Sequence, residues 1–454
     1  MARGPLKGYP ILSCISDHHQ FLTNLKFDRN KFIDSSSKEF WKQSDGLGYR
    51  PCLNFSDDYQ NLSSRTMKKN RFLMVVVSGG LNQQKIQITD AVVIARILGA
   101  TLILPVLHVN PIWGDESEFS DIFDDQHFKE TLREDVHVLS TLPATHITKR
   151  PARASIPLHF DEDWVRTHLM EQINKNSVLL LRQFDSRLSK NLNPDLQKLR
   201  CKVAFHALKF KAWIEKLGEK LAVRMSEGRP YMALHLRLEK DVWVRTGCLP
   251  GLGEEADHKI EIERASHPEL LTGRSNNITA GDRYMAGLCP LNAMEITRLL
   301  KAFGASKSTR IYWAGGVPFG GERALEPIRT QYPHLTNKWD LADEEELRPL
   351  KNRSSILAAL DYIVCLKSHV FMANHGGNMA RSLQGHRAYL GHKKHITPNK
   401  KQLVHLFVNQ KNLGEKEMDE EIRKMHFSSS GSPLMIRPNR DVIAFPFPDC
   451  MCTS

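Results

Sequence analysis

The chain has 454 residues, of which 41% are hydrophobic and 25% charged, with a formal net charge of +12. This composition excludes a disordered chain, and no apolar run approaches the ~18 residues of a membrane span. The length predicts two domains, each with its own core. The positive charge is dispersed, without zinc-finger spacing or a basic helix. We therefore expect anionic ligands such as sugar nucleotides, no nucleic acid, and a chain that is soluble as given.

An alternation of strands and helices follows an irregular N-terminal segment, residues 1–45. The apolar run Phe72–Val77 has the length of a buried strand and ends in the turn Ser78-Gly79-Gly80. A helical pattern follows until Gly99, and Thr101–Pro105 predicts a second strand. Together they form a βαβ unit with its glycine turn at the carboxyl end of the first strand.

The rest of the first half contains a predicted buried strand at Val178–Arg182 and a long amphipathic helix from about Cys201 to Ser226. The polar stretch Glu227-Gly228-Arg229-Pro230 then predicts a domain boundary. We expect an N-terminal domain at 46–228, a C-terminal domain at 229–410 and a C-terminal tail at 411–454.

The second half repeats the alternation. Three strands are predicted, one before Arg237, one at Arg310–Trp313 and one at His369–Asn374. Helices are predicted at Pro290–Gly304, around Ser355–Lys367 and from Asn378, and a polar insert occupies 250–282. The fold class is therefore α/β, with two Rossmann-like domains facing a cleft, and ligands favour such domain interfaces.

The stretch around Arg237 is the most informative part of the chain. An apolar strand ends there in ionisable residues, and ligand chemistry in open α/β sheets sits at the carboxyl ends of strands. His235 and Arg237 are two apart, so they point to the same side of an extended segment. An arginine fixed there presents a planar fork suited to pyrophosphate oxygens. An ordinary strand end with salt bridges has the same residues, so this stretch alone leaves both readings open.

Three further features suit a nucleotide ligand. The turn Gly79-Gly80-Leu81-Asn82 places backbone N–H groups at a helix start, where anions or sugar hydroxyls bind well. Asp361 lies on a predicted helix, where a carboxylate accepts paired N–H donors from a guanine or uracil edge. Gly377 and Asn378 open another helix, whose N–H groups and macrodipole favour phosphate. Taken singly, each is also typical of an ordinary turn or a surface carboxylate.

Other patterns do not indicate chemistry. Asp161-Glu162-Asp163 has the form of a metal-binding DxD triplet but lacks a flanking apolar strand, so we interpret it as structural. The histidines lack metal-ligand spacing, and no nucleophile elbow occurs. Among eight cysteines, Cys248 and Cys289 bracket a polar insert and are the pair that we expect to form a disulfide.

Taken in order, these stretches resemble the plant O-fucosyltransferase-like family, a distant relative of the animal protein O-fucosyltransferases. The resemblance runs from about Phe40 to Cys452. Its landmarks are Phe40-Trp41, Gly46–Cys52, Gly79–Gln83, Phe119–Asp124, Leu199–Cys201, His235–Asp241, Gly247-Cys248, Asp361–Val364, Gly377–Ala380 and Gly385–Arg387.

The resemblance implies a GT-B-like glycosyltransferase whose C-terminal half holds the donor nucleotide. His235, Leu236 and Arg237 match the family's donor-contacting HxR segment. Arg237 matches the arginine that neutralises the diphosphate, and Asp241 the acidic residue that completes the motif, so these two are the expected catalytic residues. The other expected donor-binding residues are Asp361 against the base, Gly377, Asn378 and Met379 against phosphates and base, and Gly79, Gly80, Leu81 and Asn82, with Asn82 near the reacting sugar.

The implied reaction is inverting transfer of a deoxyhexose, above all fucose from GDP-fucose, to a hydroxyl of a protein or glycan acceptor, without a metal or other cofactor. A rhamnosyltransferase that uses UDP-rhamnose on a cell-wall polysaccharide, and a catalytically silent nucleotide- or glycan-binding member, are the alternatives. The resemblance also implies the secretory pathway and the Golgi lumen. Family members are typically held there by one N-terminal span, and this chain shows none.

Overall fold

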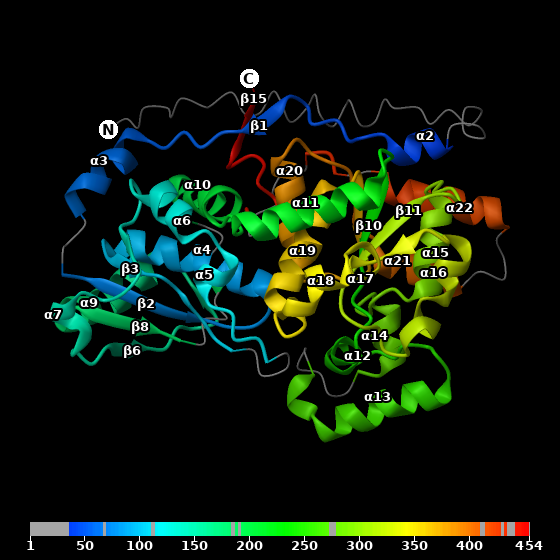
Figure 1. Cartoon of the computed structure of the whole chain (residues 1–454), viewed down its shortest axis with the longest axis horizontal. Coiled ribbons are helices and arrows are strands. Elements are labelled where there is room, and N and C mark those ends of the chain that lie inside the picture. Colours follow the sequence, from blue (N-terminus) through cyan, green and yellow to red (C-terminus); the bar gives the residue numbers. More distant parts are fainter. Residues whose placement is uncertain are drawn as a thin grey trace, which may run out of the picture.

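The computed structural model describes residues 36–66, 70–109, 114–182, 187–188, 192–271, 278–408, 414–427, 431–433 and 441–453. Two α/β halves lie side by side in it (Figure 1). Most of the predicted N-terminal segment lies outside the described residues, and its last part begins helix α2, Ser36–Trp41.

The first half is built on a parallel sheet with the strand order β5-β3-β2-β8-β6, and β4 also pairs with β2. The strands are β2 (Phe72–Val77), β3 (Thr101–Ile103), β4 (Val106–Leu107), β5 (Val138–Leu139), β6 (Ala152–Ala154) and β8 (Val178–Leu181). Helix α4 (Leu81–Leu98) follows β2 and ends at Gly99, which has the left-handed conformation that glycine adopts freely. The predicted βαβ unit is confirmed.

The second half has a five-stranded parallel sheet with the order β12-β11-β10-β13-β14. Its strands are β10 (Tyr231–His235), β11 (Arg310–Ala314), β12 (Leu335–Thr336), β13 (Val370–Ala373) and β14 (His395–Ile396). The strand order reverses between β10 and β13. In doubly wound sheets ligands bind at the carboxyl ends of the strands at such a reversal, here the ends after His235 and Ala373.

Helices surround both sheets (Figure 1). In and before the first half they are α3 (Asp57–Thr66), α5 (Phe119–Ile122), α6 (Asp125–Leu132), α7 (Ala144–Ile147), α8 (Glu162–Trp164), α9 (Met170–Asn176) and α10 (Pro194–Lys202). Those that follow are α11 (Ala212–Ser226), α12 (Lys240–Thr246), α13 (Glu254–Ser266), α14 (Ala280–Met285), α15 (Ala293–Ala302), α16 (Glu326–Gln331), α17 (Lys338–Leu341), α18 (Glu344–Leu347), α19 (Ser354–Lys367), α20 (Asn378–Tyr389), α21 (Lys400–Val408) and α22 (Glu415–His426).

The single long helix predicted from Cys201 to Ser226 is wrong. Helix α10 ends at Lys202, a π-helical turn spans Val203–Ala207, and α11 begins only at Ala212. The intervening residues leave the helix because Phe210 stacks on Phe123 in the core of the first half, with ring centroids 5.6 Å apart. Burying an aromatic ring outweighs the modest helix propensity of this stretch.

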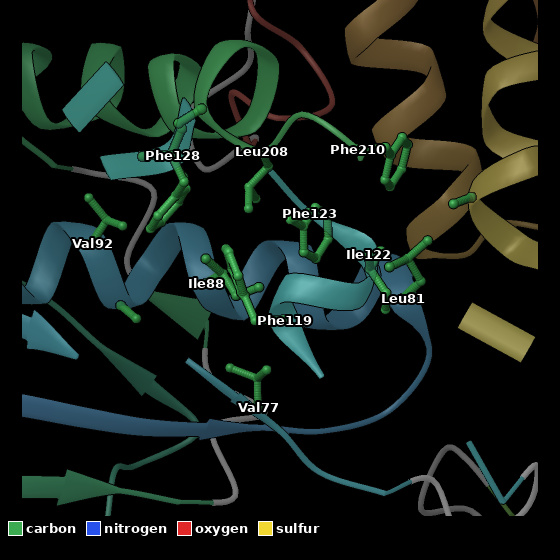
Figure 2. Close-up of a cluster of buried hydrophobic side chains, with 14 of the residues drawn as sticks. Val77, Leu81, Ile88, Val92, Phe119, Ile122, Phe123, Phe128, Leu208 and Phe210 are labelled. Carbon is green, nitrogen blue, oxygen red and sulfur yellow. The ribbon is translucent and has the colours of Figure 1, made fainter. Parts of the chain in front are cut away.

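One hydrophobic core joins the two halves. Figure 2 shows its first part, in which Phe119 and Ile122 of α5, and Phe123 directly after it, pack on α4. The same core continues to α11 and α19, where a Cβ added to Gly218 would lie 2.8 Å from Ile363. The predicted boundary at residue 228 falls between α11 and β10, and the exact domain limits stay a prediction. A second core covers the other face of the β10 sheet, so this parallel sheet is buried on both faces.

Three disulfides link distant parts of the chain within the described residues. Cys248–Cys289 is the predicted pair and is confirmed. Cys52–Cys452 and Cys201–Cys450 bind the C-terminal residues to the first half, where β1 (Tyr49–Pro51) also pairs with β15 (Met451–Thr453). Cys365 is a buried free thiol, and Cys14 lies outside the described residues. Within the described ranges, no helix has the length and apolar character needed to cross a membrane.

Candidate functional site

Arg237 lies just beyond the carboxyl end of β10 and is held from three sides. Its backbone N–H donates to Asn374 Oδ1 at 2.7 Å, and its Nε donates to Glu239 Oε2 at 3.2 Å. Its Nη2 lies 3.7 Å from Asp241 Oδ2. The side chain stays 31% exposed. Two carboxylates therefore fix a guanidinium that remains open to a ligand.

The start of α20 faces this guanidinium. Gly377 precedes the helix in an extended conformation, without a side-chain cap, so the first N–H groups of α20 are available to a ligand. A Cβ added to Gly377 would lie 4.0 Å from Arg237 Nη1, and one added to Gly376 would meet nothing within 4 Å. Asn378 is the first helical residue, and Met379 packs against the shared core. This arrangement suits a phosphate group.

His235 and Leu236 support the site from below. His235 is buried, and burial, together with the charge of Arg237, lowers the pKa of its imidazole to about 3. The ring is therefore neutral near pH 7 and acts as a hydrogen-bonding group. Its Nδ1 has no hydrogen-bond partner within the described residues. Leu236 is buried in the second core, so any contact that it makes with a ligand comes from its backbone.

Asp361 is brought to the same end of the sheet, but in a buried position. Its two oxygens accept from Tyr312 Oη at 2.6 Å and from Lys338 Nζ at 2.8 Å. Lys338 also donates to the carbonyl of Gly315 at 3.1 Å. The two charged side chains are each 6% exposed. Asp361 is therefore one half of a buried ion pair.

The turn Gly79-Gly80-Leu81-Asn82 belongs to the first half. Gly79 has a φ of 86°, and Gly80 precedes α4 without a side-chain cap. Asn82 is buried, and its Oδ1 accepts no hydrogen bond from any described residue. The turn faces the second half because α4 packs against α19 and α20.

A charged contact joins these two groups of site residues. Lys85 lies one helical turn after Asn82, and its Nζ sits 4.1 Å from the ring centroid of Tyr362, the neighbour of Asp361. Burial lowers the pKa of this ammonium to about 8. The predicted residues therefore form two groups, one on each half, which meet across the contact between α4 and α19.

Some site residues were missed from the sequence. Lys338 and Tyr312 belong to no recognisable motif, and only the fold brings them to Asp361. Asn374 was included only as a strand end, although a polar residue at the carboxyl end of a buried strand is a signal. Asp161 caps α8 by accepting from Trp164 N at 2.9 Å, as expected of a structural triplet. Within the described ranges, no three His, Cys, Asp or Glu side chains gather as metal ligands.

The family model and the relatives that a comparison with known proteins finds agree with one another. Residues 72–390 match the family described as GDP-fucose protein O-fucosyltransferase. O-fucosyltransferase 24 of Arabidopsis thaliana is 56% identical over 92% of this chain and 73% of its own length. O-fucosyltransferase 20 of the same plant is 54% identical over 98% of this chain and 78% of its own length.

Solved structures resemble the chain only loosely. A crystal structure of POFUT1 in complex with GDP covers 73% of this chain and 99% of its own, with 12% identity and a TM-score of 0.46. At this score the likeness adds nothing to the two parallel sheets described above.

Proposed function

Because this chain belongs to the GDP-fucose protein O-fucosyltransferase family and is a glycosyltransferase, we propose that it transfers fucose from GDP-fucose to a hydroxyl of a protein or glycan acceptor. The transfer inverts the configuration at the anomeric carbon. As the C–O bond to the diphosphate breaks, negative charge builds up on the departing GDP.

One observation carries this proposal. Arg237 is fixed by Glu239 and Asp241 beside the uncapped start of α20, where a guanidinium and a helix N-terminus converge. Both are sources of positive charge, and both favour a diphosphate over a neutral ligand. We therefore propose that Arg237 and the start of α20 stabilise the leaving diphosphate without a metal ion.

The other predicted residues receive roles around this centre. Neutral His235 hydrogen-bonds the donor beneath Arg237, and Asn378 and Met379 line the nucleotide at the start of α20. Asp361 is assigned to the end of the site that holds the base. Asn82, on the opposite half, is assigned to the fucose side. As the C–O bond to the diphosphate breaks, the acceptor oxygen bonds to the anomeric carbon from the opposite face and its proton passes to solvent. No residue is assigned as a base for this proton, and we propose that departure of the diphosphate limits the rate.

We also propose that the chain works in the lumen of the secretory pathway. Six of its cysteines form disulfides, and structural disulfides persist in oxidising compartments.

Calorimetry with purified protein tests the function. GDP-fucose and GDP are expected to bind in the micromolar range, with no change when EDTA is added, and UDP-rhamnose and UDP to bind much more weakly. Arg237→Ala should weaken GDP binding on the order of 100-fold. Preference for the uridine pair would replace fucosyl by rhamnosyl transfer, and failure of all four ligands to bind folded protein would refute the proposal.

Arg224→Ala is the matched control. Arg224 is also held by two carboxylates, those of Asp343 and Glu346, and is 28% exposed, but it lies on α11. Its loss should leave GDP binding unchanged. If both substitutions weaken GDP binding equally, the loss at Arg237 does not come from a contact between its guanidinium and GDP.

A further inference from the structure

Glu239, which holds Arg237, is itself held by the turn after β11. Its Oε1 accepts from the backbone N–H of Gly316 at 2.9 Å, while its Oε2 accepts from Arg237. The turn is pressed against the Arg237 segment, because a Cβ added to Gly315 would lie 2.4 Å from the carbonyl oxygen of Leu236. Gly315 also has a φ of 149°, which only glycine adopts freely. The position of Glu239 thus depends on the position of this turn.

The turn is fixed from its other side by Lys338. The ammonium of Lys338 donates to the carbonyl oxygen of Gly315 and to one oxygen of Asp361. Tyr312 Oη donates to the other oxygen of Asp361. A buried ion pair adds little net stability, since desolvation offsets the attraction. What Lys338 supplies is a fixed direction for the carbonyl of Gly315.

We propose that Lys338 is a positioning residue for Arg237, and that Asp361 acts on the reaction through Lys338. The connection runs from Asp361 to Lys338, to the Gly315-Gly316 turn, to Glu239 and to the guanidinium. The proposal rests on the proposed function of Arg237. It also gives Asp361 a second role beside its place at the base end of the site, because a carboxylate that accepts from Lys338 at one oxygen and from Tyr312 at the other helps to hold the diphosphate-binding arginine in place.

GMP and GDP separate these two roles. GDP has the additional phosphate that Arg237 is proposed to hold, whereas both ligands present the same base. Lys338→Met is therefore expected to weaken GDP binding about tenfold more than GMP binding, because the guanidinium loses its fixed orientation. Turnover of GDP-fucose should fall with GDP affinity. Lys202→Met is the matched control, since Lys202 pairs with buried Asp135 at the same 2.8 Å in the first half.

Two further variants guard against a simple folding defect. Lys338→Met leaves the Asp361 carboxylate buried without its cation, which is destabilising. Combining it with Asp361→Asn removes that charge, so the melting temperature should recover while the GDP-to-GMP discrimination stays low. In the Arg237→Ala background, Lys338→Met should cause no additional loss of GDP affinity, because its only route to the ligand is already gone.

The outcomes are distinct. Equal weakening of GMP and GDP by Lys338→Met, or losses that add in the double variant with Arg237→Ala, would overturn the positioning role while leaving the proposed function intact. Failure of the wild-type protein to bind GDP would overturn both. A selective loss of GDP over GMP that Arg237→Ala abolishes supports the proposal.

Discussion

The glycine turns after β2 and after β13 have the same sequence pattern, a buried strand followed by two glycines and a helix, yet they differ in what requires the glycines. Gly79 has a φ of 86°, whereas Gly377 is extended and a Cβ added to it would lie 4.0 Å from Arg237 Nη1. The asparagines beside the turns differ as well. Asn82 Oδ1 has no partner within the described residues, whereas Asn374 bonds Arg237 and Leu291. The backbone conformation requires glycine in the first turn, whereas room for a ligand requires glycine in the second.

The largest expected effect tests whether the second turn is where the anionic diphosphate binds. Arg237→Ala should lower GDP-fucose turnover on the order of 100-fold, about 3 kcal/mol of transition-state stabilisation, because the departing diphosphate loses its fixed countercharge. Release of GDP from GDP-fucose measures the rate. Lys85→Met, at the contact between the halves, should reduce turnover less. A larger loss at Lys85 would place the main charge stabilisation on the first half.

Lowering the pH should destabilise the second half more than the first. Burial lowers the pKa of His235, His375, His386 and His395 from 6.5 to about 3, and all four lie in the second half. Since the folded-state pKa is the lower one, the unfolded chain takes up protons first. The free energy of unfolding should therefore fall as pH drops from 6.5 towards 3, by about 2 kcal/mol per histidine at pH 5.

Hydrogen exchange at pH 7 and pH 5 locates this loss, which should be greater around β10 and β13 than around β2. His235→Gln should make urea unfolding less dependent on pH, whereas His405→Gln, at an exposed position of α21, should not. Equal acid destabilisation of both sheets would show that these histidines do not control it.

The two asparagines allow a matched comparison of stability. Asn374→Ala should lower the free energy of unfolding by about 2 kcal/mol, because its partners, Arg237 N and Leu291 O, lose their hydrogen bonds. Asn82→Ala should leave the free energy of unfolding unchanged or raise it slightly. The same change should reduce the turnover of GDP-fucose more than the affinity for GDP. Urea denaturation and the two ligand assays measure these effects. A stability loss at Asn82 as large as that at Asn374 would contradict the contrast.

Substitution of the two glycines by alanine should have the smallest effects. Gly79→Ala should cost about 1–2 kcal/mol of stability, since an alanine there is forced into a left-handed conformation. Gly377→Ala should leave thermal stability unchanged and weaken GDP binding, because its methyl group enters the space before Arg237. Differential scanning fluorimetry with and without GDP compares them. If the alanine at 377 destabilises more, that glycine also serves the backbone.

The strand and helix framework of the site was predictable because its signals are local. Phe72–Val77 is a continuous apolar run stopped by glycines, and the structure gives β2 the same limits. The helices predicted around Ser355–Lys367 and from Asn378 correspond to α19 and α20. Parallel strands buried on both faces produce such runs regardless of what packs on them.

What the sequence did not predict depends on contacts between distant residues. The break before Ala212 exists because Phe210 reaches Phe123, and no Gly or Pro marks it. Lys338 becomes a site residue only when α17 is folded beside Asp361. Cys248–Cys289 was predictable because it closes a short insert, whereas the partners of Cys450 and Cys452 lie in the first half, beyond the reach of spacing rules.

These last two disulfides have a consequence for biosynthesis. Cys201 and Cys450 are 249 residues apart, and Cys52 and Cys452 are 400 apart. At a translation rate of roughly 5–20 residues per second, Cys450 is synthesised about 10–50 s after Cys201, and the interval between Cys52 and Cys452 is longer still. During that interval both are thiols on a nascent chain, open to mispairing with Cys248 or Cys289. The half that is translated first is therefore the half that is covalently completed last.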